Sequence, residues 1–174
     1  MQTFVILLRG INVGGNNLLP MKTLVPLLTA NGYQNISTYI QSGNIVLTSN
    51  NDTSPEQDIK ALITEQFGFT PNTFVIQANE FSESVVNNPY QSFEGKFVHF
   101  YFCQQDIKLK MDNVDKWLSS TESYSVENNV FYLHAPEGIG RSKLVANIES
   151  CLGQPATGRN LNTVNKITTM IGGK

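Results

Sequence analysis

Residues that mark small cross-linked or metal-binding proteins are scarce in this chain of 174 residues. It has two cysteines and two histidines, and the cysteines, Cys103 and Cys151, lie far apart without a CxxC partner. This spacing argues against a disulfide framework or a zinc knuckle, and it predicts two buried free thiols. His99 and His134 have no evident third ligand, so we expect no metal site and no cofactor.

Long apolar runs are also lacking, and none approaches the roughly 20 residues that cross a membrane. Residues 1–9 have no basic start and no small-residue cleavage site, so we interpret them as a strand rather than as a signal peptide. From these two absences we expect a cytoplasmic protein that does not associate with a membrane.

Acidic residues are absent from the first 51 positions, which carry a net charge of +2. Residues 52–137 carry −8 and residues 138–174 carry +4, which gives a total of −2. The nearly neutral total argues against a general nucleic-acid binder. Two basic ends around an acidic middle indicate an anion site built from both ends. The alternative is that the asymmetry arises by chance, because each end holds only a few cations.

The chain does contain a regular succession of strand and helix patterns. In the first half the expected strands are residues 3–9, 36–41, 45–48 and 73–77. The expected helices begin at Pro20 and at Ser54-Pro55. The order β-α-β-β-α-β is that of a ferredoxin-like plait.

The second half repeats this order. Its expected strands are residues 97–102, 124–126, 130–133 and 156–159, and its expected helices are residues 113–118, 140–152 and 160–171. We therefore predict an α+β protein of two tandem ferredoxin-like subdomains with a C-terminal helix. The first subdomain is expected over residues 1–79, a linking helix and loop over 80–95, and the second subdomain with the terminal helix over 96–174.

This topology predicts which loops meet. The first two strands of a plait are parallel, so residues 10–17 and residues 42–44 are expected at the same end of the first sheet. By the same reasoning, residues 135–143 and the pair Arg159-Asn160 are expected at one end of the second sheet. The sequence thus predicts two clusters of loops.

All three arginines, Arg9, Arg141 and Arg159, stand beside a glycine. The rigid guanidinium fork suits phosphate or carboxylate, and glycine lets the backbone approach a ligand closely. Residues 138–143 also open a predicted helix, whose free N–H groups would favour an anion. The alternative is an ordinary helix start with solvated cations, because helix starts normally prefer acids.

Residues 10–17 have two interpretations, a nest of backbone N–H donors or a long turn rich in glycine and asparagine. They are not a P-loop, since no Gly-Lys-Ser/Thr follows, and their glycine spacing does not fit a dinucleotide-binding turn. The candidate ligand-binding residues of the two clusters are Arg9, Asn12, Gly14, Gly15, Gln41, Ser42, Asn44, Arg141, Ser142, Lys143, Arg159 and Asn160.

An aromatic surface is a second candidate site. Alternation places Phe97, His99 and Tyr101 on one face of their strand, and Tyr132 and His134 on one face of another. Such a set resembles the stacking platform of RNA-binding plaits, although the glycines and basic residues of that motif are missing. The alternative is a sheet face buried against the other half of the chain.

No catalytic constellation is evident. Spacing places no histidine or lysine base near Ser42 or Ser142, apart from the adjacent Lys143, and no Gly-x-Ser-x-Gly elbow occurs. Glu137 has the chemistry of a general acid or base, but a loop carboxylate is usually just solvated. Whether the protein is an enzyme stays open.

Several segments together resemble a bacterial family of uncharacterised proteins, the domain of unknown function 1697. They are LRGINVGG at residues 8–15, YIQSGN at residues 39–44, GRSKL at residues 140–144, and Ala156-Thr157 with Arg159-Asn160 and Thr163. The resemblance covers essentially the whole chain. It implies two ferredoxin-like subdomains and no particular activity, and its motifs fall on the loop positions that residue chemistry selects.

Two functional hypotheses follow. The first is a binding protein or enzyme for a small anionic, phosphate-bearing ligand, held by the arginines with neutral hydrogen bonds from Asn12, Gln41, Asn44 and Asn160. The alternative is a nucleic-acid or protein-interaction module that uses the aromatic sheet face, with nucleic acid disfavoured by the charge. The sequence does not determine the oligomeric state.

Overall fold

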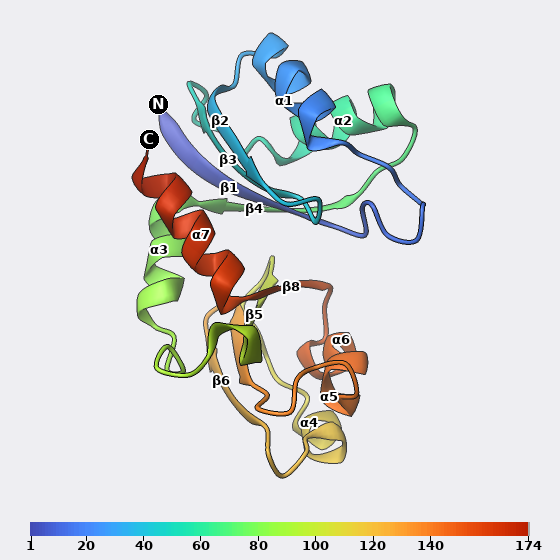
Figure 1. The fold of residues 1–174 in the computed structure, drawn as a ribbon, viewed down its shortest axis with the longest axis vertical. Helices are drawn as coiled ribbons and strands as arrows, with labels where there is room; N and C mark the ends of the chain where they lie inside the picture. The colour runs from blue at the N-terminus through green and yellow to red at the C-terminus, as the bar shows by residue number, and fades with distance from the viewer. Residues whose placement is uncertain (174) are drawn as a thin grey trace. The chain divides into compact units, whose positions relative to one another are not determined.

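The structure is a computed structural model that describes residues 1–173, so the predicted second subdomain ends one residue beyond them, at Lys174. The chain forms two four-stranded antiparallel sheets with helices, and it is the α+β protein of two ferredoxin-like subdomains that the sequence predicts (Figure 1). It divides into two compact units. One comprises Met1–Ser82 with the residues from Lys166 on, and the other comprises Glu83–Asn165.

The first unit has the strand order β2-β3-β1-β4, and β1 runs antiparallel to both of its neighbours. Its helices α1 and α2 lie on one face of the sheet (Figure 1). Its elements are β1 (Gln2–Arg9), α1 (Met21–Ala30), β2 (Gln34–Tyr39), β3 (Asn44–Ser49), α2 (Glu56–Phe67) and β4 (Asn72–Gln77).

Alternation along β1 explains why the helices pack on that face. Phe4, Ile6 and Leu8 share one side of the strand and are almost completely buried. They belong to one cluster with Leu24 of α1 and Ile59 of α2. Burying each such side chain stabilises the fold by roughly 1.5–3 kcal/mol, so this face of β1 holds the two helices against the sheet.

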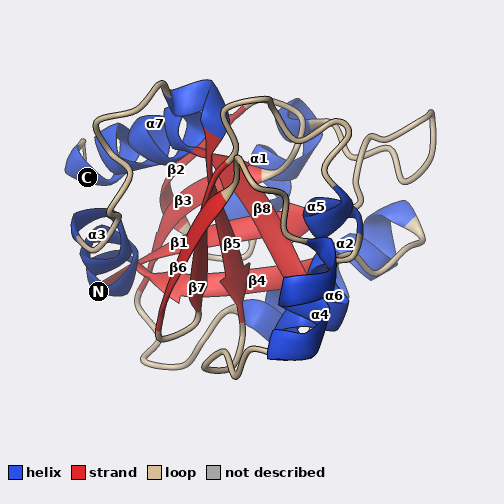
Figure 2. Cartoon of the chain, turned by 90° about the horizontal axis from the view of Figure 1, so that it is seen from below, coloured by secondary structure: helices blue, strands red, loops and turns tan. Residues whose placement is uncertain are grey.

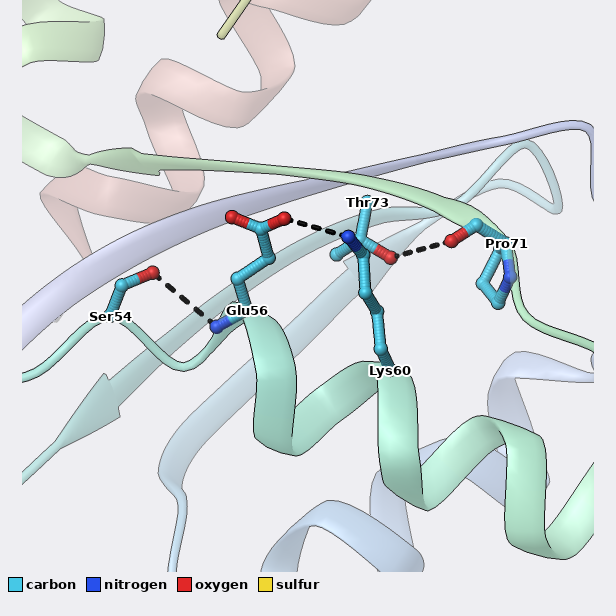
Figure 3. A network of polar contacts seen from close by, with 5 residues as sticks. All are labelled: Ser54, Glu56, Lys60, Pro71 and Thr73. Carbon is cyan, nitrogen blue, oxygen red and sulfur yellow. Dashed lines mark hydrogen bonds and ion pairs between the residues drawn. The ribbon is translucent and has the colours of Figure 1, made fainter.

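Polar contacts support the start of α2 (Figure 3). Ser54 Oγ accepts a hydrogen bond from the backbone N–H of Glu56 at 3.4 Å, and Glu56 forms an ion pair with Lys60, one turn later, at 2.7 Å. Figure 3 also shows a separate bond at the start of β4, where the Thr73 hydroxyl donates to the Pro71 carbonyl at 3.1 Å. Acidic residues in the first turn also complement the helix dipole, so the predicted Ser54-Pro55 helix start is confirmed.

The second unit repeats the plait with the order β6-β7-β5-β8. Helices α4, α5 and α6 lie together beside its sheet (Figure 2). After β4 the chain forms α3 (Ala78–Val86), then β5 (Val98–Cys103), α4 (Met111–Trp117), β6 (Ser123–Glu127), β7 (Val130–His134), α5 (Lys143–Ala146), α6 (Ile148–Leu152), β8 (Ala156–Asn160) and α7 (Leu161–Gly172).

Aromatic and sulfur-bearing side chains fill the core between this sheet and its helices. Tyr101 and Phe131 from the sheet form one cluster with Leu144 of α5 and Cys151 of α6. The two cysteines are free and buried, so the predicted burial of both thiols is confirmed.

One predicted helix, residues 140–152, is in fact two short helices, α5 and α6. Asn147 separates them, with φ −119° and ψ 21°, outside the helical range. Its side-chain amide donates to the Lys143 carbonyl at 2.8 Å, which is a local bond that competes with the regular helical pattern. The segment that opens at Gly140 therefore gives only four helical residues before the break.

The sheet register corrects the predicted aromatic surface. Tyr101 pairs with Phe131 and His99 with Leu133, whereas Tyr132 pairs with Phe100. Directly opposed residues of antiparallel strands point to the same face. The set Phe97, His99, Tyr101, Tyr132 and His134 is therefore divided between two faces. Tyr101 lies in the helix-covered core and Tyr132 is only 1% exposed, so neither ring is available for stacking on a base.

Candidate functional site

The two loops predicted to meet at one end of the first sheet do meet. The backbone N–H of Leu8 donates to the Gly43 carbonyl at 2.9 Å, and the Asn12 amide donates to the Gln41 carbonyl at 2.8 Å. Residues 10–17 and residues 41–44 therefore form one surface, which confirms the plait-based prediction for the first cluster.

Asn12 is the residue that joins these loops. Its side-chain amide donates to the carbonyls of Leu19 and Gln41, and its side-chain oxygen accepts from the Leu19 N–H at 2.7 Å. Asn44, which is completely buried, donates to the Tyr39 carbonyl and to the Ser42 hydroxyl, each at 3.0 Å. Asn12 and Asn44, two of the four side-chain amides predicted to bind a ligand, thus use their N–H groups to hold the loops in place.

The tip of the first loop is a tight two-residue turn. Gly14 and Gly15 both have positive φ, 58° and 77°, and the N–H of Asn16 donates to the Val13 carbonyl at 3.0 Å. Two consecutive positive φ angles are the requirement of a type I′ hairpin turn. This geometry supports the conformational interpretation of the glycines over a nest of open backbone donors.

The remaining candidates of this cluster lie at its margin. Gln41 and Ser42 are exposed, and Arg9 is half-buried at the end of β1 opposite Asn72. Ile40, which directly precedes Gln41, is half exposed. Its φ of 50° is unusual for a β-branched residue, and sequence patterns do not reveal it. A ligand role for Arg9, Gln41 and Ser42 stays a prediction.

One part of the second cluster, residues 135–143, forms a wall of a cavity of about 690 Å³. One side is the end of α4 and the loop that follows it, and the other is the segment between β7 and α5. Ser123 of β6 pairs with His134 of β7, so the two segments leave adjacent strands at the same end of the sheet. The predicted residues Arg141, Ser142 and Lys143 all line this cavity.

Hydrogen bonds between acids and hydroxyls tie the two walls together. The Ser142 hydroxyl donates to Glu122 Oε2 at 2.5 Å, and Glu122 Oε1 accepts from the Ser119 N–H at 2.9 Å. The Thr121 hydroxyl donates to Glu137 Oε2 at 3.3 Å. Both carboxylates are therefore placed inside the cavity by contacts with neutral groups.

Glu122 is a site residue that the sequence-based selection missed. Its only local signal is the spacing Ser119-x-x-Glu122, which is typical of a side chain that bonds a backbone N–H three residues away. Its link to Ser142, 20 residues later, depends on the pairing of β6 with β7.

Three cations share the cavity with these two carboxylates: Lys116, Arg141 and Lys143. Within residues 1–173, none of the three forms an ion pair with an acidic side chain. Lys116 Nζ instead lies 4.7 Å from the centre of the Trp117 ring, and Arg141 and Lys143 are exposed. The lining is thus net positive, with cations accessible to an anion from solvent.

The cavity does not include Arg159 or Asn160. Arg159 is 9% exposed on β8, opposite Phe100, and donates to the Thr157 hydroxyl at 2.7 Å and to the Gly158 carbonyl at 2.9 Å. Burial lowers the pKa of its guanidinium to about 10. Asn160 accepts a hydrogen bond from the Thr163 N–H at 3.0 Å and so supports the start of α7. The structure therefore does not bring Arg141 and Arg159 together.

The predicted helix-start site at residues 138–143 is also corrected. Helix α5 is a single turn, and the Ser142 hydroxyl already accepts the N–H of Val145 at 3.1 Å. A helix this short has little dipole, and one of its free donors is occupied. The side chains of Arg141 and Lys143, rather than the helix backbone, supply the positive charge here.

Two other kinds of site were also sought. In the described part of the chain, no three or more histidine, cysteine, aspartate or glutamate side chains gather closely enough to hold a metal ion. Over the same residues, no helix combines the length and apolar character that a membrane crossing requires.

Known proteins resemble this chain in family and in fold. The model of a family described as "Protein of unknown function (DUF1697)" matches residues 1–132. Among curated proteins, none matches the chain. The solved structure of the conserved bacterial protein SP0830 from Streptococcus pneumoniae is similar over 98% of both chains, with a TM-score of 0.74 and 23% sequence identity. At that identity the likeness shows a shared fold.

Proposed function

Because the chain belongs to the family of proteins of unknown function DUF1697, whose description names no activity, we propose a function from its own cavity: the second unit binds a small anionic ligand that carries a phosphate group. The observation that carries this proposal is a set of three cations in one cavity that have no ion-pair partner among residues 1–173. A volume of about 690 Å³ fits a metabolite-sized ligand.

Arg141 and Lys143 have complementary roles in this proposal. A guanidinium binds two phosphate oxygens in a planar fork, and an ammonium group adds a mobile point charge. Both side chains leave the backbone on either side of Ser142, whose hydroxyl is fixed by Glu122. A phosphate bound between them would find two cations at one wall, while the Ser142 hydroxyl, whose proton goes to Glu122, holds the segment in place.

The two carboxylates accept hydrogen bonds from Ser119, Thr121 and Ser142 rather than from the cations. They lower the positive charge of the lining without cancelling it, because three cations stand against two carboxylates. The free, buried thiols of the same unit also agree with a protein of the reducing cytoplasm.

A thermal-shift screen with phosphate, sulfate, nucleotides and sugar phosphates tests the proposal. A ligand at about 100 times its Kd stabilises by about 2.7 kcal/mol, which raises Tm of a protein of this size by roughly 5–10 °C. We expect this rise in the wild type and its loss in Arg141→Ala. Lys108→Ala removes an exposed cation of the same unit outside the cavity and should keep the full shift. If no anion stabilises the wild type more than Arg141→Ala, the proposal fails.

A further inference from the structure

The cavity holds a hydrogen-bond acceptor that anion binding alone does not require. Glu137 Oε2 has a single long contact with the Thr121 hydroxyl at 3.3 Å, and no hydrogen bond from residues 1–173 reaches Glu137 Oε1. Glu122, in contrast, has both oxygens engaged by the protein. Glu137 is therefore the acidic group of this lining with acceptor capacity for a ligand.

A bare polyanion would fit this lining poorly. Two carboxylates beside the cations repel each further negative charge of a ligand. A ligand with one phosphate group and a neutral remainder avoids this repulsion, because its charge meets Arg141 and Lys143 while its remainder lies toward Glu137.

A carboxylate only accepts hydrogen bonds, so the neutral remainder must donate them. Hydroxyl groups and an ammonium group are the usual donors, but three cations against two carboxylates leave the lining net positive, which disfavours an ammonium group. Trp117, Leu118 and Ala135 add apolar surface to the same cavity, which suits the C–H side of a carbon skeleton. The lining thus combines cations, an open carboxylate and apolar surface.

We infer that the ligand of this cavity is a phosphate monoester of a polyhydroxylated molecule, such as a sugar phosphate, and that Glu137 accepts hydrogen bonds from its hydroxyl groups. This inference rests on the proposed anion-binding function and narrows it to a class of ligand. It assigns recognition of the phosphate to Arg141 and Lys143, and recognition of the carbon skeleton to Glu137.

Isothermal titration of the full chain with three monoesters tests the inference. Glucose 6-phosphate carries hydroxyl groups, methyl phosphate carries none, and ethanolamine phosphate carries an ammonium group. We expect glucose 6-phosphate to bind about tenfold more tightly than the other two, as one hydrogen bond to a charged group predicts. Glu137→Gln should reduce this preference, because a neutral amide oxygen accepts a weaker hydrogen bond than a carboxylate, and it should leave methyl phosphate binding unchanged or slightly tighter.

The matched control is Glu127→Gln, which neutralises an exposed acid at the far end of β6 and should keep the preference. Equal affinities for the three monoesters, or an unchanged preference in Glu137→Gln, would overturn the inference and leave anion binding standing. If none of the monoesters binds and Arg141→Ala has no effect, the proposed function falls together with the inference.

Discussion

At Gly43, the turn between β2 and β3 lies so close to β1 that it leaves no room for a side chain. Its φ is 88°, and a Cβ there would lie 2.7 Å from Leu8 Cβ and 2.9 Å from Ile11 Cδ1. Real Cβ atoms do not approach other atoms so closely. Gly14, at the tip of the neighbouring loop, has φ 58° and open space around it. Gly43 is therefore required by close packing as well as by its backbone conformation, whereas Gly14 is required by its backbone conformation alone.

Replacing each by alanine separates these needs. Gly14→Ala adds only the strain of a left-handed backbone, about 1–2 kcal/mol. Gly43→Ala adds the same strain and a clash with two buried side chains, for which we expect a total loss of about 3 kcal/mol or more. Urea unfolding of both variants measures the difference, and equal losses would contradict the packing role of Gly43.

At the scale of elements, Asn12 links the loop after β1 to the turn before β3. It does so with three hydrogen bonds, two to Leu19 and one to Gln41. It also has φ 55°, a conformation that asparagine tolerates better than most residues. A single side chain thus orders two loops that lie 29 residues apart in the sequence.

Asn12→Gly tests this link, because glycine keeps the positive φ and removes only the side chain. We expect a loss of about 2–3 kcal/mol, from three hydrogen bonds of about 1 kcal/mol each. Hydrogen exchange at the Leu19 amide should be faster in this variant, because its N–H loses the Asn12 acceptor. Asn16→Gly, at an exposed position of the same loop, should lower the free energy of unfolding much less than Asn12→Gly does. Similar losses for both variants would show that Asn12 has no special role in holding the loops.

At the scale of the whole molecule, both units bury weak acids in protonated form. Burial raises the pKa of Tyr33 in the first unit, and a hydrogen bond to Asp58 adds to the effect. In the second unit, burial and then the Glu149 carboxylate raise the pKa of Cys103 from 9.0 to about 12, and burial raises that of Tyr101 as well. The folded chain therefore keeps protons that the unfolded chain releases.

This difference predicts a loss of stability at alkaline pH. The contribution of Cys103 is fully present below pH 9 and is lost as the pH rises from 9.0 toward 12. Over that range its loss amounts to on the order of 4 kcal/mol. The lowered pKa of Arg159 has the opposite effect above pH 10, because there the folded chain releases a proton that the unfolded chain keeps. The net loss of stability should therefore begin between pH 9 and 10, where only the raised pKa values act.

Unfolding free energies measured in urea from pH 7 to pH 10 check this prediction. Cys103→Ala should be less stable at neutral pH, because it leaves a small cavity, and should lose less on going to pH 10. A decline of the same steepness in Cys103→Ala would show that this thiol does not contribute.

The sequence by itself determined the order of the elements and the ends at which loops meet. Hydrophobic periodicity is local, so the sequence revealed the two β-α-β-β-α-β patterns. Their topology correctly placed residues 10–17 at the same end of the sheet as the turn at residues 42–44, where Asn12 bonds the Gln41 carbonyl. The same logic selected residues 135–143, from which Arg141, Ser142 and Lys143 line the cavity.

Only the tertiary structure decided which side chains share a face or a bond. A shift of one residue in register moves a side chain to the other face of a sheet, and the strands alone do not specify the register. This is why Tyr101 and Tyr132 were wrongly grouped, and why the burial of Arg159 was not foreseen. The bond from Ser142 to Glu122 likewise depends on the pairing of β6 with β7, which no local pattern contains.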